Sequence, residues 1–141
     1  FFLFNFLILT PYHYTYLNIF IGKFSEASKK FENDYWGVSI KELVNKTKEN
    51  KIFSENLNYK IAFCGINYDI ATHYLKGINN LKFIKTSKDD DYDFIIMTNR
   101  HNAKTGDKKK DIKTCYNSYK GKDILSVKRN GLILSTIRQK F

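Results

Sequence analysis

The sequence predicts an α/β protein, with a small open sheet, flanking helices and a C-terminal β-hairpin, preceded by the end of a transmembrane helix. The sheet is indicated by a strand, a helix and two more strands that follow one another in mid-chain. Two alternating apolar runs around Asn130 and Gly131 indicate the hairpin. The apolar opening FFLFNFLILT indicates the membrane part. A length of 141 residues suits one domain.

Residues 1–24 are predicted to form the end of a transmembrane helix and the interfacial segment behind it. A crossing helix needs about 20 apolar residues. The apolar opening would therefore be the last part of such a helix, with the chain starting inside it. Tyr12, Tyr14 and Tyr16 come where hydropathy falls, as in the aromatic belt of a lipid–water interface. A core helix in a wholly soluble protein is the alternative. Residues 25–141 are predicted to form a small soluble α/β domain.

The clearest helix of that domain is an amphipathic one predicted over residues 39–50. Ser39 can cap it, and Glu42 stands three residues later at the capping-box position. An apolar stripe at helical spacing then marks the face that should lie on the sheet. This stripe consists of Ile40, Leu43, Val44 and Thr47.

A strand and a second helix are predicted next. The run YKIAFCGI is nearly continuous in its apolar character, as in a strand covered on both faces, and it ends at Gly65. The segment NYDIATHYLKG predicts a helix with Asp69 as its N-terminal acid and Gly77 at its C′ position. The joining turn CGINYD is where α/β proteins present backbone N–H groups to ligands. A phosphate site would have more glycines, so an ordinary connection is the preferred interpretation.

Two further strands are predicted in LKFIKT, 81–86, and FIIMTNR, 94–100. The charged segment SKDDDYD separates them. Its carboxylates could hold a divalent cation, but their spacing fits no calcium loop, so a solvated turn is preferred. These carboxylates are Asp89, Asp90, Asp91 and Asp93.

The last third of the chain is predicted to contain a basic loop, a short helix and the hairpin. The loop is HNAKTGDKKKD, the helix lies in IKTCYNSYKG, and the hairpin strands are DILSVKR and LILSTIRQKF. The loop lysines would touch anionic headgroups if the loop faced a membrane, but a solvated loop is the default. They are Lys104, Lys108, Lys109 and Lys110.

The two cysteines leave two structures open. Cys64 and Cys115 are too few for a disulfide framework, and they have no zinc-ligand spacing. Cys64 lies in an apolar run, where a buried inert thiol is preferred. A bridge between the two remains open if the domain faces an oxidising compartment.

A charge of +10 raises the question of nucleic-acid binding. Of the 24 basic residues, 21 are lysines spread along the chain and three are arginines. Phosphate and base recognition favours arginine, so a solvated lysine surface is preferred over a nucleic-acid site. A soluble basic α/β module that binds nucleotide or nucleic acid remains the alternative function.

No group of residues predicts catalysis, a metal site or a cofactor. The histidines, His13, His73 and His101, are far apart in sequence and have no serine or cysteine nucleophile motif nearby. Each is interpreted as a surface or interface residue.

Two motifs carry a family resemblance. The first is PYHYTYLNIFIG, with Pro11, the three interfacial tyrosines and Asn18, and the second is FENDYWGVSIKE, with Glu32. With KIAFCG and VKRNGLILSTIRQ, they make the chain resemble the C-terminal region of bacterial multi-spanning GT-C type glycosyltransferases. These enzymes are similar to the dolichyl-phosphate-mannose protein mannosyltransferases of glycosyltransferase family 39. The resemblance covers most of the chain outside 99–120.

The resemblance implies a non-catalytic C-terminal domain of an integral membrane glycosyltransferase, which transfers a sugar from a polyprenyl-phosphate donor. The catalytic residues of such enzymes lie in the membrane portion, so none is carried over. The implied partners are membrane lipid and that membrane portion. The implied location is the bacterial inner membrane, with this domain periplasmic. Lys23, Lys29 and Lys30 behind the apolar opening oppose that orientation under the positive-inside rule.

The second motif supplies the expected contact residues. Tyr35 and Trp36 are amphipathic rings suited to the edge of a bilayer or to the membrane portion. Asp34 can cap or pair locally, and it is a candidate contact for acceptor or sugar. Gly37 permits a tight turn before the next helix.

Overall fold

The computed structural model describes residues 3, 4, 7, 38–54, 56–84, 91–99, 114–129 and 131–141. The predicted interfacial tyrosines Tyr12, Tyr14 and Tyr16 and the predicted contacts Asp34, Tyr35, Trp36 and Gly37 lie outside these residues. So does the basic loop with its four lysines. The predictions for those positions remain predictions.

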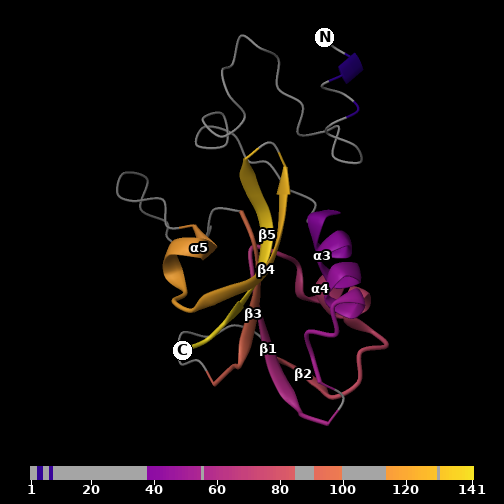
Figure 1. Cartoon of the computed structure of the whole chain (residues 1–141). Helices are drawn as coiled ribbons and strands as arrows, with labels where there is room; N and C mark the ends of the chain where they lie inside the picture. The colour runs from indigo at the N-terminus through magenta and orange to yellow at the C-terminus, as the bar shows by residue number, and fades with distance from the viewer. Residues whose placement is uncertain are drawn as a thin grey trace.

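Three helices and five strands make up the described part of the domain (Figure 1). They are, in chain order, α3 (Val38–Glu49), β1 (Tyr59–Cys64), α4 (Tyr68–Leu75), β2 (Leu81–Ile84), β3 (Phe94–Thr98), α5 (Cys115–Ser118), β4 (Lys122–Arg129) and β5 (Leu132–Gln139).

The strands form one mixed sheet with the order β2-β1-β3-β5-β4. β1 lies between β2 and β3 and is parallel to both. β5 is antiparallel to β3 on one side and to β4 on the other. The predicted fold class, an open α/β sheet with flanking helices and a C-terminal hairpin, is confirmed.

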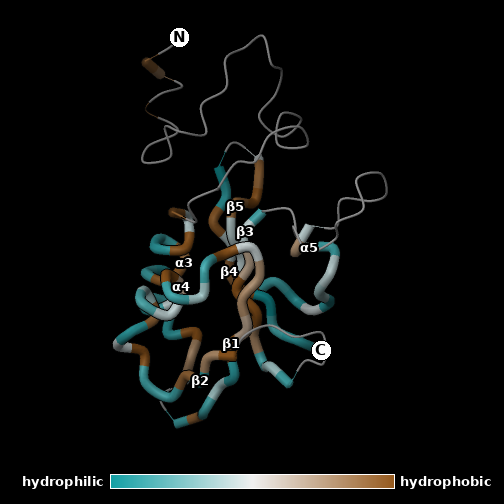
Figure 2. The backbone as a smooth tube through the Cα atoms, turned by 180° about the vertical axis from the view of Figure 1, so that it is seen from behind, coloured by the Kyte–Doolittle hydropathy of each residue, from teal (hydrophilic) through white to brown (hydrophobic). Residues whose placement is uncertain are grey.

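The two faces of the sheet are covered separately. α3 and α4 lie on one face and α5 on the other, as Figures 1 and 2 show from opposite sides. Successive residues of a strand point to opposite faces. Accordingly, Ile61 and Phe63 of β1 belong to the core under α3 and α4, whereas Ala62 and Cys64 belong to a second cluster beside α5. β3 is buried along its whole length, and its sequence is apolar from Phe94 to Met97 rather than alternating.

Helix α3 packs through the predicted stripe. Ile40 and Leu43 have no exposed surface, and the buried Thr47 has its hydroxyl satisfied because it donates to the Leu43 carbonyl at 2.7 Å. The predicted cap is wrong: the helix begins at Val38, so Ser39 lies inside its first turn. Glu42 does not complete a capping box but pairs with basic side chains.

One of those pairs ties α3 to β4, the outer strand of the sheet. A carboxylate oxygen of Glu42 accepts from Arg129 of β4 at 2.6 Å, and the other lies 2.9 Å from Lys46, one turn along α3. The charge-assisted bond to Arg129 crosses from helix to sheet. α3 is therefore fixed by its apolar stripe and by an ion pair at its rim.

The short helix α4 has the predicted ends. Asn67 is its N-cap, and its side chain accepts from the backbone N–H of Asp69 at 2.8 Å and of Ile70 at 3.4 Å. Asp69 lies in the first turn, as predicted. Gly77 follows the C-cap Lys76 with φ +88°, a left-handed conformation that favours glycine.

The hairpin of β4 and β5 is also as predicted. Arg129 pairs with Leu132, so two residues form the turn, and Gly131 has φ +82° as such turns require. The ladder between the two strands changes register between Asp123 and Leu125 and again between Val127 and Lys128. The extra residue is Ile124 of β4 at the first change and Leu134 of β5 at the second.

Candidate functional site

The adjacent ends of β1 and β3 form the edge where an α/β sheet most often binds ligands. From β1, which ends at Cys64, the chain passes to α4 on one face of the sheet. Beyond β3, which ends at Thr98, the next described helix is α5 on the other face. Two parallel neighbours followed by elements on opposite faces define a topological switch point, and ligands of α/β sheets bind outside such points.

The turn after β1 is already bonded internally. Gly65 has φ +77°, and its carbonyl accepts from the Thr98 hydroxyl of the neighbouring strand at 2.7 Å. The Asn67 side chain occupies two N–H groups in the first turn of α4. Those donors would otherwise be the ones offered to a bound anion. The geometry therefore favours the ordinary connection that the sequence predicted for CGINYD.

A disulfide closes this edge on the side of α5. Cys64, the last residue of β1, is bonded to Cys115, the first residue of α5, with their Cα atoms 5.8 Å apart. Cys115 is fully buried, and Cys64 retains 8% of its surface. Of the two structures left open by the sequence, the chain adopts the bridge. The disulfide joins segments 51 residues apart and anchors α5 to the sheet.

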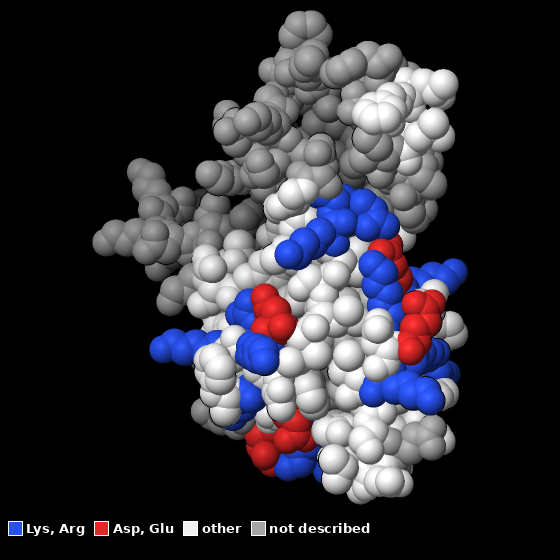
Figure 3. Space-filling model, viewed as in Figure 1, with Lys and Arg blue, Asp and Glu red and all other residues white. Residues whose placement is uncertain are grey.

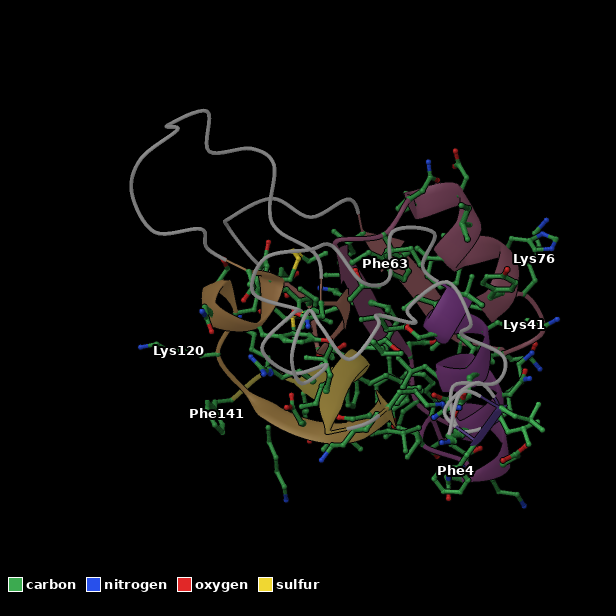
Figure 4. The ribbon with its side chains drawn as sticks, turned by 90° about the horizontal axis from the view of Figure 1, so that it is seen from above. Phe4, Lys41, Phe63, Lys76, Lys120 and Phe141 are labelled. Carbon is green, nitrogen blue, oxygen red and sulfur yellow. A yellow bond between two sulfur atoms is a disulfide. The ribbon has the colours of Figure 1, made fainter. Side chains whose placement is uncertain are left out.

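Arg138 of β5 holds α5 from its other end. Its guanidinium donates to the backbone carbonyls of Tyr116, at 2.8 Å, and Tyr119, and to the Asp123 carboxylate at 2.6 Å. Only 14% of the Arg138 side chain is exposed, so these bonds are shielded from water. Viewed from above in Figure 4, α5 lies across the sheet from α3 and α4, with Lys41 and Lys76 pointing outward on the helical side and Lys120 and Phe141 outward on the side of α5.

The acidic segment before β3 has a structural role in its described part. Asp93 accepts from the Lys60 backbone N–H at 2.8 Å, and Asp91 pairs with the Lys60 ammonium. The hydrogen bond and then the charge of Lys60 lower the pKa of Asp91, whose side chain is exposed. Asp89 and Asp90 lie outside the described residues, and the described ones contain no group of three potential metal ligands.

The described surface does not gather one sign of charge on the face shown in Figure 3. Each group of acidic side chains there lies beside basic ones. His73, the histidine within the described residues, is exposed on α4 and has its ring 5.9 Å from that of Tyr74. Its surroundings match the predicted surface residue.

Two observations bear on the predicted membrane segment. Among the described residues, no helix is both long and apolar enough to cross a membrane. Leu3, Phe4 and Leu7 have helical backbone and are exposed by 67, 66 and 61%, so their side chains are not packed into the domain.

The bonds of Arg138 and the ion pair of Glu42 with Arg129 are among the stabilising contacts that the sequence did not predict. The available signal was the scarcity of arginine: two of the three arginines, Arg129 and Arg138, lie in the hairpin strands and both make inter-element bonds. No protein-family model, curated protein or solved structure compared with the chain matches it.

Proposed function

We propose that this chain is the non-catalytic C-terminal α/β domain of a bacterial integral membrane glycosyltransferase that uses a polyprenyl-phosphate sugar donor. The domain would steady the last membrane helix and help to hold the acceptor. The observation that carries this proposal is the order of the two motifs, with Tyr12, Tyr14 and Tyr16 followed by Asp34, Tyr35, Trp36 and Gly37, directly ahead of a folded α/β unit.

The attachment of the second motif to the domain supports a mechanical role. Gly37 is covalently followed by Val38, the first residue of α3. α3 is bound to the sheet through Ile40, Leu43 and the Glu42–Arg129 pair. A contact between the motif and a membrane portion would thus be transmitted to a rigid unit.

The disulfide supports a location outside the cytoplasm. Structural disulfides form and persist in oxidising compartments such as the periplasm, and they are rare in the cytosol. The Cys64–Cys115 bond is buried, so it belongs to the structural class. The disulfide favours the periplasm, whereas Lys23, Lys29 and Lys30 favour a cytoplasmic side. The lysines carry less weight, because large C-terminal domains are translocated largely regardless of charge.

Leu3, Phe4 and Leu7 support the membrane attachment. Soluble proteins rarely expose apolar side chains in groups, and such groups mark membrane or protein contacts. Hydrocarbon is the environment that the apolar opening would fit best.

The proposal is tested with the protein encoded by the complete open reading frame, in lipid nanodiscs with a polyprenyl-phosphate sugar donor. Donor consumption is expected, and Trp36→Ala or Asp34→Asn should lower its rate about tenfold or more by misplacing the reacting groups. Lys41→Gln on the exposed side of α3 is the matched control and should leave the rate unchanged. A reading frame without hydrophobic spans upstream, or unchanged rates in both motif variants, would refute the proposal.

A second candidate function, binding of a nucleotide or nucleic acid, is favoured by the switch point between β1 and β3 alone. It predicts that ATP shifts the amide resonances of Gly65 and Asn67, or that RNA binds with an affinity that falls steeply with salt. If neither ligand binds at low salt, this candidate is excluded.

A further inference from the structure

A groove opens at the end of the domain away from the disulfide. It lies between the last turn of α3 with the segment behind it and the residues that follow α4, and its volume is about 560 Å³. This size is within the range of about 300 to 1,000 Å³ that small-molecule sites occupy. None of the functions above uses it.

The groove combines an apolar wall with a polar rim. Phe53, which retains 8% of its surface, and the half-buried Ile78 supply the wall. Phe53 is fixed there by ring contacts with Tyr59 and Phe94, whose centroids lie 5.5 and 5.3 Å away. The polar rim consists of Lys48, Lys51, Ser54 and Asn79.

The charge of the rim is positive. Lys48 and Lys51 line the same groove, and neither has a carboxylate partner among the described residues. In this they differ from Lys46, which Glu42 neutralises. No described residue that lines the groove is acidic.

The ends of the two helices reduce this charge without cancelling it. The C-terminal ends of α3 and α4 both approach the groove, and each carries about half a negative elementary charge. Two lysines contribute two positive charges. Glu49, the last residue of α3, does not line the groove. The charge of the lining is therefore still positive, and an anion is attracted there more than a cation.

We propose that this groove binds a small amphipathic anion, a molecule with a phosphate or carboxylate group joined to an apolar ring. The ammonium groups of Lys48 and Lys51 hold the anion, and Ser54 and Asn79 offer further hydrogen-bond donors. The ring lies against Phe53 and Ile78. An anion without a ring would contact only the lysine rim, and a ring without an anion would contact only the apolar wall.

The test is a titration of the isotopically labelled full chain, followed by amide resonances, with phenyl phosphate, inorganic phosphate and benzyl alcohol as separate probes. Phenyl phosphate should shift the resonances of Lys51, Ser54 and Ile78 with saturation. Each of the other probes should bind about tenfold or more weakly, because it lacks one of the two contacts. Equal affinity for inorganic phosphate, or no saturable shift with phenyl phosphate, would overturn the proposal.

Two variants locate the anion. Lys48→Gln and Lys51→Asn should each weaken phenyl phosphate about fivefold, as expected for the loss of one partly exposed ion pair. Asparagine is chosen because Lys51 has φ +46°, and asparagine tolerates this left-handed conformation. Lys41→Gln, on the same helix and outside the groove, is the control. Equal affinities in all three variants would show that the anion does not bind here.

Discussion

In the part of the chain that the structure describes, one face of the sheet is covered by helices of 12 and eight residues, whereas the other carries a helix of four. The helical face is held by apolar packing, with Ile40, Leu43 and Leu75 fully buried against the sheet. The opposite face has a smaller buried cluster, to which a disulfide and the bonds of Arg138 are added. A segment that buries little apolar surface needs covalent or charged attachments to stay ordered.

Removal of the disulfide is expected to have the largest effect on the difference between the two faces. Replacement of Cys64 and Cys115 by alanine should lower the free energy of unfolding by up to about 4 kcal/mol, because the open chain between them regains its entropy when unfolded. Urea unfolding measures the loss. The amides of α5 should also lose hydrogen-exchange protection before those of α3. Equal loss of protection in α3 and α5 would show that the disulfide does not act locally.

The corresponding change on the helical face is Leu43→Ala. Leu43 is fully buried between α3 and the sheet, so the substitution should cost about 3 kcal/mol through lost burial and a cavity. Urea unfolding again measures it. Unlike the cysteine variant, it should lower protection throughout α3, α4 and β1. Lys41→Ala, exposed on the same helix, should change stability by less than about 0.5 kcal/mol.

A smaller effect is expected from Arg138→Met, which keeps the aliphatic stem and removes the donors to α5. It should cost about 2 kcal/mol, since two carbonyls and the Asp123 carboxylate lose their partner. The cost should be larger when the disulfide is absent, because both attachments hold the same helix. A double-mutant cycle measures this coupling, and strict additivity would contradict a shared role.

The smallest effect concerns Asp91, whose pKa is lowered by Lys60. A carboxylate with a lowered pKa in the folded state contributes stability above its unfolded-state pKa of about 3.9, and the contribution is lost as pH falls through the lower folded-state value. Lys60→Met should therefore raise the pKa of Asp91 toward the ordinary value. Carboxyl NMR titration checks the direction, and an unchanged pKa would show that Lys60 is not the cause.

The sequence predicted the elements of the fold because each carries its own local pattern. The stripe of α3, the apolar run of β1 and the turn of the hairpin depend on neighbours within a few residues. The position of β5 between β3 and β4 depends on distant pairing and was not predicted. A signal existed: LILSTI is apolar or small throughout, as an inner strand requires, whereas β4 carries charges at both ends.

The attachments of α5 could not be derived from the sequence. The two cysteines are 51 residues apart, and a bridge requires their Cα atoms to come within about 7 Å. That distance follows only from the end of β1 and the start of α5 meeting at one edge of the sheet. The groove beside Phe53 is hidden from sequence inspection for the same reason. The contacts expected of Asp34, Tyr35, Trp36 and Gly37 lie outside the described residues and remain predictions.

The two borders of the sheet bear on how these domains behave at high concentration. An outer strand with regularly spaced free N–H and C=O groups is a template onto which another chain can add. β4 carries one extra residue, Ile124, near its start, and β2 at the opposite border is only four residues long. Neither border therefore offers a long, even row of groups to a neighbour. We therefore expect that the sheets of neighbouring molecules do not join at these borders when the domain is concentrated.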